Sequence, residues 1–226
     1  MTLFLDYWIL LPLLALFLLG LLWNHKIEYK KSKIRALHDA LLWMYQDLNF
    51  NTEDYSSADI RITLWSPISN DQKIESYRMQ QILDYVPPLG QLNAPKGTGA
   101  RKHKTAGRVF RFTRAKDNDI LAIGIAGLCV IDFVKNHRPK IHREVIPSGV
   151  DFVDYMVTNW HFTRPQAELL TADRRSYLCG PLMDRSAHSL YGIIYIDSSS
   201  PDALSTSIAT KIRKKYLSRI SDLFEP

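Results

Sequence analysis

The sequence has too few cysteines to build a disulfide framework or a zinc site rich in thiolate ligands. Only two of its 226 residues are cysteines, Cys129 and Cys179, and both lie in apolar runs. A disulfide scaffold needs several paired cysteines, and a structural zinc site needs four ligands at a regular spacing. We therefore expect both cysteines to be buried small hydrophobic side chains, and we expect no metal site.

The sequence also lacks the local motifs of common catalytic and nucleotide-binding sites. No recognisable nucleophile and base signature is present, and the glycines of residues 90–106 are not followed by the Gly-Lys-Ser/Thr of a phosphate-binding loop. No motif supports binding of nucleic acid beyond positive charge. We therefore expect no enzymatic activity and no nucleic-acid partner, and the sequence names no cofactor.

A long uncharged run lies near the N-terminus, from Tyr7 to Trp23. As a helix it would be roughly 25 Å long, and Leu3–Leu5 can extend it toward the thickness of a bilayer core. Trp8 and Trp23 lie near its ends, where aromatic residues meet the membrane surface. The pattern predicts a transmembrane anchor over residues 1–24.

The charges that flank this run predict its orientation. Asp6 is the only charge before it, whereas the segment after it is rich in lysine and carries few acids, beginning with Lys26, Lys30 and Lys31. This asymmetry predicts an inner-membrane protein with its N-terminus outside and the remainder in the cytoplasm. A cleaved signal peptide would need basic residues before the run and a small-residue cleavage site after it, and neither is present.

Apolar residues at helical spacing continue through residues 25–50, which predicts a juxtamembrane helix. Ile34, Leu37 and Leu41 follow one another at intervals of three and four residues. Such a seam can pack inside the chain's own domain, or it can pair with a second copy of the chain. We expect a homodimer that uses these three residues and the C-terminal helix, with packing inside the domain as the open alternative.

The remaining residues, 51–226, have the composition of one globular domain. Alternation and apolar runs predict strands at Ile60–Trp65, Tyr77–Val86 and Asp119–Phe133. A polar segment at Asn136–Ser148 predicts a loop. Helices are predicted at Val150–Leu170, with a bend near Pro165, and at Pro201–Leu223.

A pair of strands near the C-terminus is the strongest signal in the domain. Ser176–Met183 and Leu190–Asp197 flank a polar turn, and the second run is apolar on both faces. Such a strand lies inside a sheet that is covered on both sides. Gly180 and Gly192 indicate that a helix or a ligand approaches the backbone closely.

The segment RSYLCGPLMD…YGIIYIDSSSPDA, within Arg174–Ala203, resembles the last strand pair of a GAF domain, the small sensor module of bacterial signalling proteins. The resemblance implies an α/β fold of the α+β sandwich kind, with a central antiparallel sheet between helices. It also implies that Gly107–Phe112 begins a helix beside a ligand pocket. It implies signal transduction through a bound small molecule, and it does not identify that molecule.

Positive charge is concentrated between Lys96 and Lys116, a window with eight basic residues and no acid. Three explanations stay open: a solvated loop, attraction to the anionic inner leaflet, and recognition of a phosphorylated ligand by Arg108 and Arg111.

Together these patterns predict a membrane-anchored sensor that binds a small anionic ligand. A ligand-free dimerisation or scaffold module is the alternative, and a redox enzyme of the GAF type that uses the cysteines is a third possibility. The candidate ligand-binding residues are the following: Arg108, Arg111, Phe112, Phe152, Tyr155, Tyr177 and Cys179.

Overall fold

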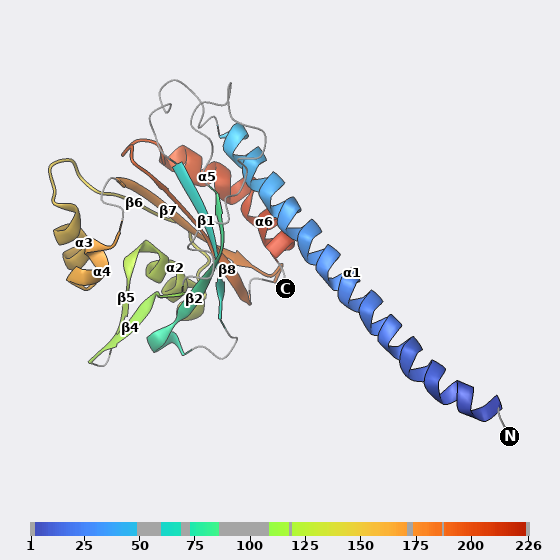
Figure 1. Ribbon diagram of the computed structural model, residues 1–226. Coiled ribbons are helices and arrows are strands. Elements are labelled where there is room, and N and C mark those ends of the chain that lie inside the picture. The colour runs from blue at the N-terminus through green and yellow to red at the C-terminus, as the bar shows by residue number, and fades with distance from the viewer. Residues whose placement is uncertain are drawn as a thin grey trace. The chain divides into compact units, whose positions relative to one another are not determined.

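The computed structural model describes residues 3–48, 60–68, 73–85, 109–117, 119–170, 174–186 and 188–224, without the side chains of 3–17, 30 and 83–85 (Figure 1). The chain divides into two compact units, Met1–Leu37 and His38–Pro226. The predicted loop at 90–106 and Arg108 lie outside the described residues.

The first unit is part of a single long helix, α1 (Leu3–Asp47), so the helix predicted after the apolar run is confirmed. Where side chains are described, no helix combines the length and the apolar character that crossing a membrane requires.

The second unit is built on a six-stranded sheet in which every neighbouring pair is antiparallel. Its strand order is β3-β2-β1-β8-β7-β6, and a separate two-stranded hairpin joins β4 to β5. The strands are β1 (Ile60–Pro67), β2 (Arg78–Tyr85), β3 (Val109–Arg111), β4 (Thr113–Lys116), β5 (Asp119–Ala122), β6 (His142–Val145), β7 (Ser176–Met183) and β8 (Leu190–Ser198).

Helices cover both faces of this sheet (Figure 1). One face packs against α2, and the other packs against α6. The helices of the second unit, besides the end of α1, are the 3-10 turn η2 (Ile74–Ser76), α2 (Gly124–Val134), α3 (Phe152–Trp160), α4 (Arg164–Glu168), α5 (Thr206–Lys215) and α6 (Leu217–Phe224).

The strand pair β7–β8 confirms the strongest prediction from the sequence. β8 lies between β1 and β7, and Ile193, Ile194 and Ile196 are fully buried although they point to opposite faces. Successive side chains of a strand face opposite ways, so β8 contributes to both layers of the core. The fold class is therefore confirmed as an α+β antiparallel sheet between helices.

The end of α1 is fastened to α5 through the side chain of Asp47. The Tyr216 hydroxyl and the Lys215 ammonium, 2.9 Å away, both donate to this carboxylate, and Lys211 donates to the Asp47 carbonyl oxygen at 2.6 Å. The hydrogen bond from Tyr216 and then that from Lys215 hold the pKa of Asp47 well below its usual value. These contacts make residues 38–47 part of the globular unit.

Two predicted elements are wrong in type. Asp119–Phe133 was expected to be one strand, but it is β5 followed by α2, because Gly124 takes a φ of 68° and turns the chain into the helix. Gly107–Phe112 was expected to begin a helix, but Val109–Arg111 is β3, an edge strand paired with β2. Local apolar content alone did not distinguish a buried helix from a buried strand.

Other boundaries also differ from the prediction. The expected loop Asn136–Ser148 contains the short edge strand β6, and the expected helix Val150–Leu170 is two helices separated at His161, which has a φ of 57°. The C-terminal helix begins after Ser205, whose hydroxyl accepts from the Ile208 amide, rather than at Pro201.

The two glycines of the central strand pair, Gly180 and Gly192, lie where α6 packs on the sheet. The sequence indicated that either a helix or a ligand approaches them, and the structure shows a helix. A Cβ on Gly192 would meet the Trp65 carbonyl oxygen and the Phe224 ring at distances shorter than real contacts allow. A Cβ on Gly180 would meet only the ends of the Ile141 and Leu217 side chains, at 3.3 Å. Packing of α6 accounts for Gly180, together with the Ile141 side chain, whereas Gly192 is required by the β1 carbonyl as well as by α6.

We expect Gly192→Ala to destabilise the protein by about 2 kcal/mol or more, because a backbone carbonyl cannot yield to the added methyl group. Gly180→Ala is the matched control, since flexible side-chain ends can move aside. Urea unfolding of both variants measures the difference, and equal stabilities would contradict this account of the packing.

Candidate functional site: an aromatic cavity with an arginine

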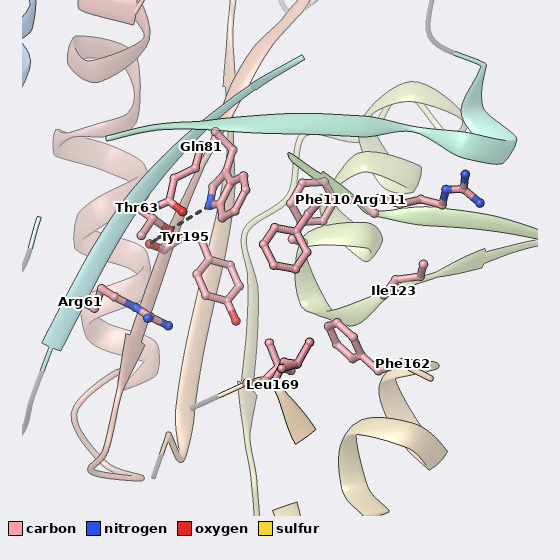
Figure 2. Close-up of a pocket in the computed structure, with 13 residues that line it drawn as sticks. Arg61, Thr63, Gln81, Phe110, Arg111, Ile123, Phe162, Leu169 and Tyr195 are labelled. Carbon is pink, nitrogen blue, oxygen red and sulfur yellow. Dashed lines mark hydrogen bonds between the residues drawn. The ribbon is translucent and has the colours of Figure 1, made fainter. Parts of the chain in front are cut away.

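A cavity of about 150 Å³ lies on the α2 face of the sheet, within the second unit. Its walls come from β1, β2, β3 and β8, from α2, and from the segments that flank α4 (Figure 2). The lining residues are Arg61, Thr63, Trp65, Gln81, Phe110, Arg111, Phe112, Ile123, Ala126, Phe162, Leu169, Leu170 and Tyr195.

Strand alternation explains why three residues of β1 line the cavity. Arg61, Thr63 and Trp65 are two residues apart, so they lie on one face of the sheet, and Ile60, Ile62 and Leu64 lie on the other. Thr63 is directly opposite Tyr195 of β8 in the register. The same pleat that buries the isoleucines therefore places these polar side chains toward the cavity.

Aromatic rings form one side of the cavity. The Trp65 ring meets the rings of Phe110 and Phe112 edge to face, with centroids 5.4 and 5.5 Å apart. The Trp65 indole N–H donates to the Thr63 hydroxyl oxygen at 2.9 Å, which fixes the ring in place (Figure 2). Such a wall is suited to the flat face of an unsaturated ring.

A buried ion cluster lies beside the cavity. Asp197 is 0% exposed, and its Oδ2 accepts from Arg61 Nε at 3.1 Å and from Arg61 Nη2 at 2.6 Å. Arg174 Nε lies 3.2 Å from Asp197 Oδ1. Two guanidinium groups therefore share one fully buried carboxylate. The Arg61 side chain is 31% exposed and lines the cavity, so one of these guanidinium groups is at the cavity wall.

Two tyrosines near the cluster are held in the neutral form. Burial raises the pKa of Tyr195 well above its usual value, and the nearby Tyr177 and Asp197 add to the shift. Burial also raises the pKa of Tyr177, whose hydroxyl donates to the Arg174 carbonyl oxygen at 3.2 Å. Neither hydroxyl contributes a negative charge that would offset the arginines.

Some of the residues predicted as ligand-binding line the cavity, and others do not. Arg111 and Phe112 are part of the lining. Phe152, Tyr177 and Cys179 are buried in the core and are not part of the lining. Tyr155 also lies away from it and donates its hydroxyl to Glu144 at 2.6 Å.

The two cysteines lie together in the core and are not part of the cavity lining. Both are free thiols, and both are buried. Burial, together with the adjacent Cys129 thiol, raises the pKa of Cys179 well above its usual value. A buried thiol of raised pKa is a poor nucleophile, so the geometry gives no support to a redox role. Over the described residues, no cluster of metal-ligand side chains occurs.

Most of the lining was missed because it comes from segments far apart in the sequence. Arg61, Thr63 and Trp65 could have been found from the alternation of residues 60–65, since they are the residues opposite the isoleucines. Gln81 and Tyr195 carry no comparable signal, because they join the site only through the strand order.

The residues predicted to face a membrane or a second chain lie on α1, and their exposure differs along the helix. Trp23 and Lys26 are exposed, and Lys31 forms an ion pair with Glu28 at 2.7 Å. The side chains of Trp8 and Lys30 lie outside the description. Ile34 is 52% exposed, but Leu41 is fully buried within the single chain and is not accessible to a partner. A dimer through this helix stays a prediction.

Comparison with known proteins gives structural likenesses only. No protein-family model matches the chain, and no curated protein sequence matches it. The blue-light-absorbing form of the PixJ GAF domain of Thermosynechococcus elongatus is 14% identical with a TM-score of 0.43, over 86% of this chain and 88% of that chain.

Two further solved structures are similar at a comparable level. The GAF domain of an Acinetobacter phosphoenolpyruvate-protein phosphotransferase is 12% identical with a TM-score of 0.37, over 85% of this chain and 92% of that chain. A type II free methionine-R-sulfoxide reductase of Thermoplasma acidophilum is 14% identical with a TM-score of 0.36, over 84% of this chain and 94% of that chain. The function proposed below rests on the geometry of this chain.

We expect Asp197→Asn to lower the free energy of unfolding by about 3 kcal/mol, because the buried Arg174 and the partly exposed Arg61 would lose the carboxylate that they share. Asp222→Asn is the matched control, because its pair with Arg185 lies at the surface. Urea unfolding at neutral pH measures both, and an Asp197→Asn protein as stable as the control would contradict the role of the cluster.

Proposed function

We propose that the second unit is a GAF-like sensory domain that binds a small anionic ligand in the cavity. The observation that carries the proposal is that two arginines, Arg61 and Arg111, line an aromatic cavity. Among the described residues that line the cavity, none is Asp or Glu. A bound anion would therefore face positive side chains and no carboxylate of the described lining.

Electrostatics inside a cavity favours such a ligand. A charge that is partly removed from water is costly, and it interacts more strongly with an opposite charge than it would at the surface. A guanidinium group has five N–H donors, so Arg61 can bind a ligand carboxylate or phosphate while it holds Asp197. Arg111, which also lines the cavity, adds a second positive charge.

The position of the cavity suits a sensor. It lies between the sheet and segments that flank the short helix α4, and Leu169 of its lining is 73% exposed. A ligand that contacts these segments would favour one arrangement of them over another, which is the physical basis of a ligand-dependent signal.

We also propose that residues 1–24 anchor the domain to the inner membrane, with residues 25–226 in the cytoplasm. The uncharged run Tyr7–Trp23 supports this placement, as does the lysine-rich segment that follows it. The helical backbone of α1 over the same residues is compatible with the proposal.

The ligand proposal is tested with the full chain in detergent, by thermal shift against a panel of small anionic metabolites. We expect at least one anion to raise the melting temperature, and Ala126→Leu to weaken its binding at least about tenfold, because the larger side chain fills the cavity. Ala115→Leu, at an exposed position of β4, is the matched control. The proposal is wrong if no anion stabilises the protein at saturating concentration.

The anchor is tested by washing isolated membranes with alkaline carbonate. We expect the full chain to stay in the pellet, and we expect Leu13→Arg combined with Leu16→Arg to release it, because each arginine costs about 2.5–3.5 kcal/mol at the centre of a spanning helix. Leu169→Arg, at an exposed position of the domain, should leave the protein in the pellet. Release of the unmodified chain by carbonate would overturn the anchor.

A further inference from the structure

We propose that Phe162 limits the length of the ligand, so that the native site admits an anion with one ring and excludes an anion with two linked rings. This inference rests on the proposed function, because it names the size class of the anion that the cavity accepts. It is carried by a second hollow in the same unit, which lies behind the wall that Phe162 helps to form.

This second hollow, which we call the α3 cleft, has a volume of about 340 Å³ and lies among β5, α2 and the end of α3. Its apolar side includes Leu128, which is 43% exposed, and Ile131. Its polar side includes Lys135, Asn136 and Asn159. The α3 cleft can therefore hold a group that is partly apolar and partly polar.

Two short segments of the chain border both hollows. Ile123 lines the cavity, whereas its neighbours Ala122 and Gly124 line the α3 cleft. In the same way, Phe162 lines the cavity, and residues 160–161 immediately before it line the α3 cleft. These two segments therefore form a wall that the cavity and the α3 cleft share.

The Phe162 ring closes this wall beside Gly124. A Cβ on Gly124 would lie 3.2 Å from Phe162 Cε2, so the ring packs against the glycine backbone. Gly124 also has a φ of 68°, a conformation that residues with side chains rarely adopt. Because Gly124 cannot readily carry a side chain of its own, the Phe162 ring determines whether the wall is closed at this point.

The end of α3 holds Phe162 in its place. The helix stops at His161, which has a φ of 57°, and the Phe162 amide donates to the Met156 carbonyl oxygen at 3.1 Å. Figure 2 shows Phe162 and Ile123 across the cavity from Arg61. A ligand that crosses the cavity from β1 therefore ends at this wall.

The closed wall limits the ligand to the volume of the cavity itself. A protein cavity of about 150 Å³ accepts a molecule the size of benzene. A second ring in line with the first would meet the Phe162 ring. Without that ring, the second ring of a ligand could enter the α3 cleft and bury apolar surface against Leu128 and Ile131.

The experiment is calorimetric titration of the full chain in detergent with two probes, benzoate and biphenyl-4-carboxylate. We expect the native protein to bind biphenyl-4-carboxylate at least about tenfold more weakly than benzoate, because the second ring does not fit. We expect Phe162→Ala to tighten biphenyl-4-carboxylate at least about tenfold and to leave benzoate within about threefold. Phe162→Leu, which keeps more of the packing, should tighten biphenyl-4-carboxylate by a smaller factor. Val157→Ala, at a half-buried position of α3 outside both linings, is the matched control and should keep the native preference.

A further variant tests where the second ring lies. Leu128 lines the α3 cleft and is not part of the cavity lining. In the Phe162→Ala protein, we expect Leu128→Asp to weaken biphenyl-4-carboxylate at least about fivefold, because a carboxylate beside an apolar ring would lose hydration. Benzoate should be unaffected, because it does not reach the α3 cleft.

The remaining results would each overturn the inference. Equal affinity of the native protein for the two acids, or no gain for biphenyl-4-carboxylate in either Phe162 variant, removes the length limit. Loss of both acids in folded Phe162 variants makes the ring a ligand contact instead of a limit. A gain that Leu128→Asp does not reduce places the second ring outside the α3 cleft. If neither acid binds any of these proteins, the length limit is wrong as stated, and the proposed function stands or falls separately with the anions of the thermal-shift panel.

Discussion

The ion cluster at Asp197 is the interaction on which the architecture of the site depends. Asp197 lies on β8, Arg61 lies opposite on β1, and Arg174 lies two residues before β7, so one carboxylate joins three neighbouring parts of the sheet. Because the carboxylate is fully buried, its loss would remove a counter-charge that the buried Arg174 and the partly exposed Arg61 share. The same cluster holds the Arg61 guanidinium at the cavity wall.

The sequence predicted the regular parts of this fold well. Ile60–Pro67, Ser176–Met183 and Leu190–Ser198 alternate or are apolar over their whole length, so the period of two was visible without the structure. The failures have physical causes. α2 is apolar on nearly all sides, so its periodicity is hidden, and β3 and β6 are too short for a periodic signal.

The candidate site was predicted only in part. Arg111 and Phe112 were identified by their place in a basic and aromatic stretch, and both line the cavity. Gln81 and Tyr195 could not be identified, because nothing near them in the sequence marks them, and only the strand order brings them to Thr63 and Trp65. Long-range pairing of strands is what a single sequence reveals least, so sites built across a sheet are harder to predict than sites built within one loop.

The position of β8 has a consequence for how this protein can change over time. Its odd-numbered side chains, such as Ile193 and Tyr195, belong to the cavity layer, and its even-numbered ones, such as Ile194 and Ile196, belong to the layer beneath α6. Insertion or loss of a single residue within β8 would move each set of side chains to the opposite face of the sheet. Insertions and deletions are therefore tolerated only in the turns, such as the polar turn between β7 and β8. Change in the lining of the cavity must therefore proceed by replacement of side chains on a β8 backbone of constant length.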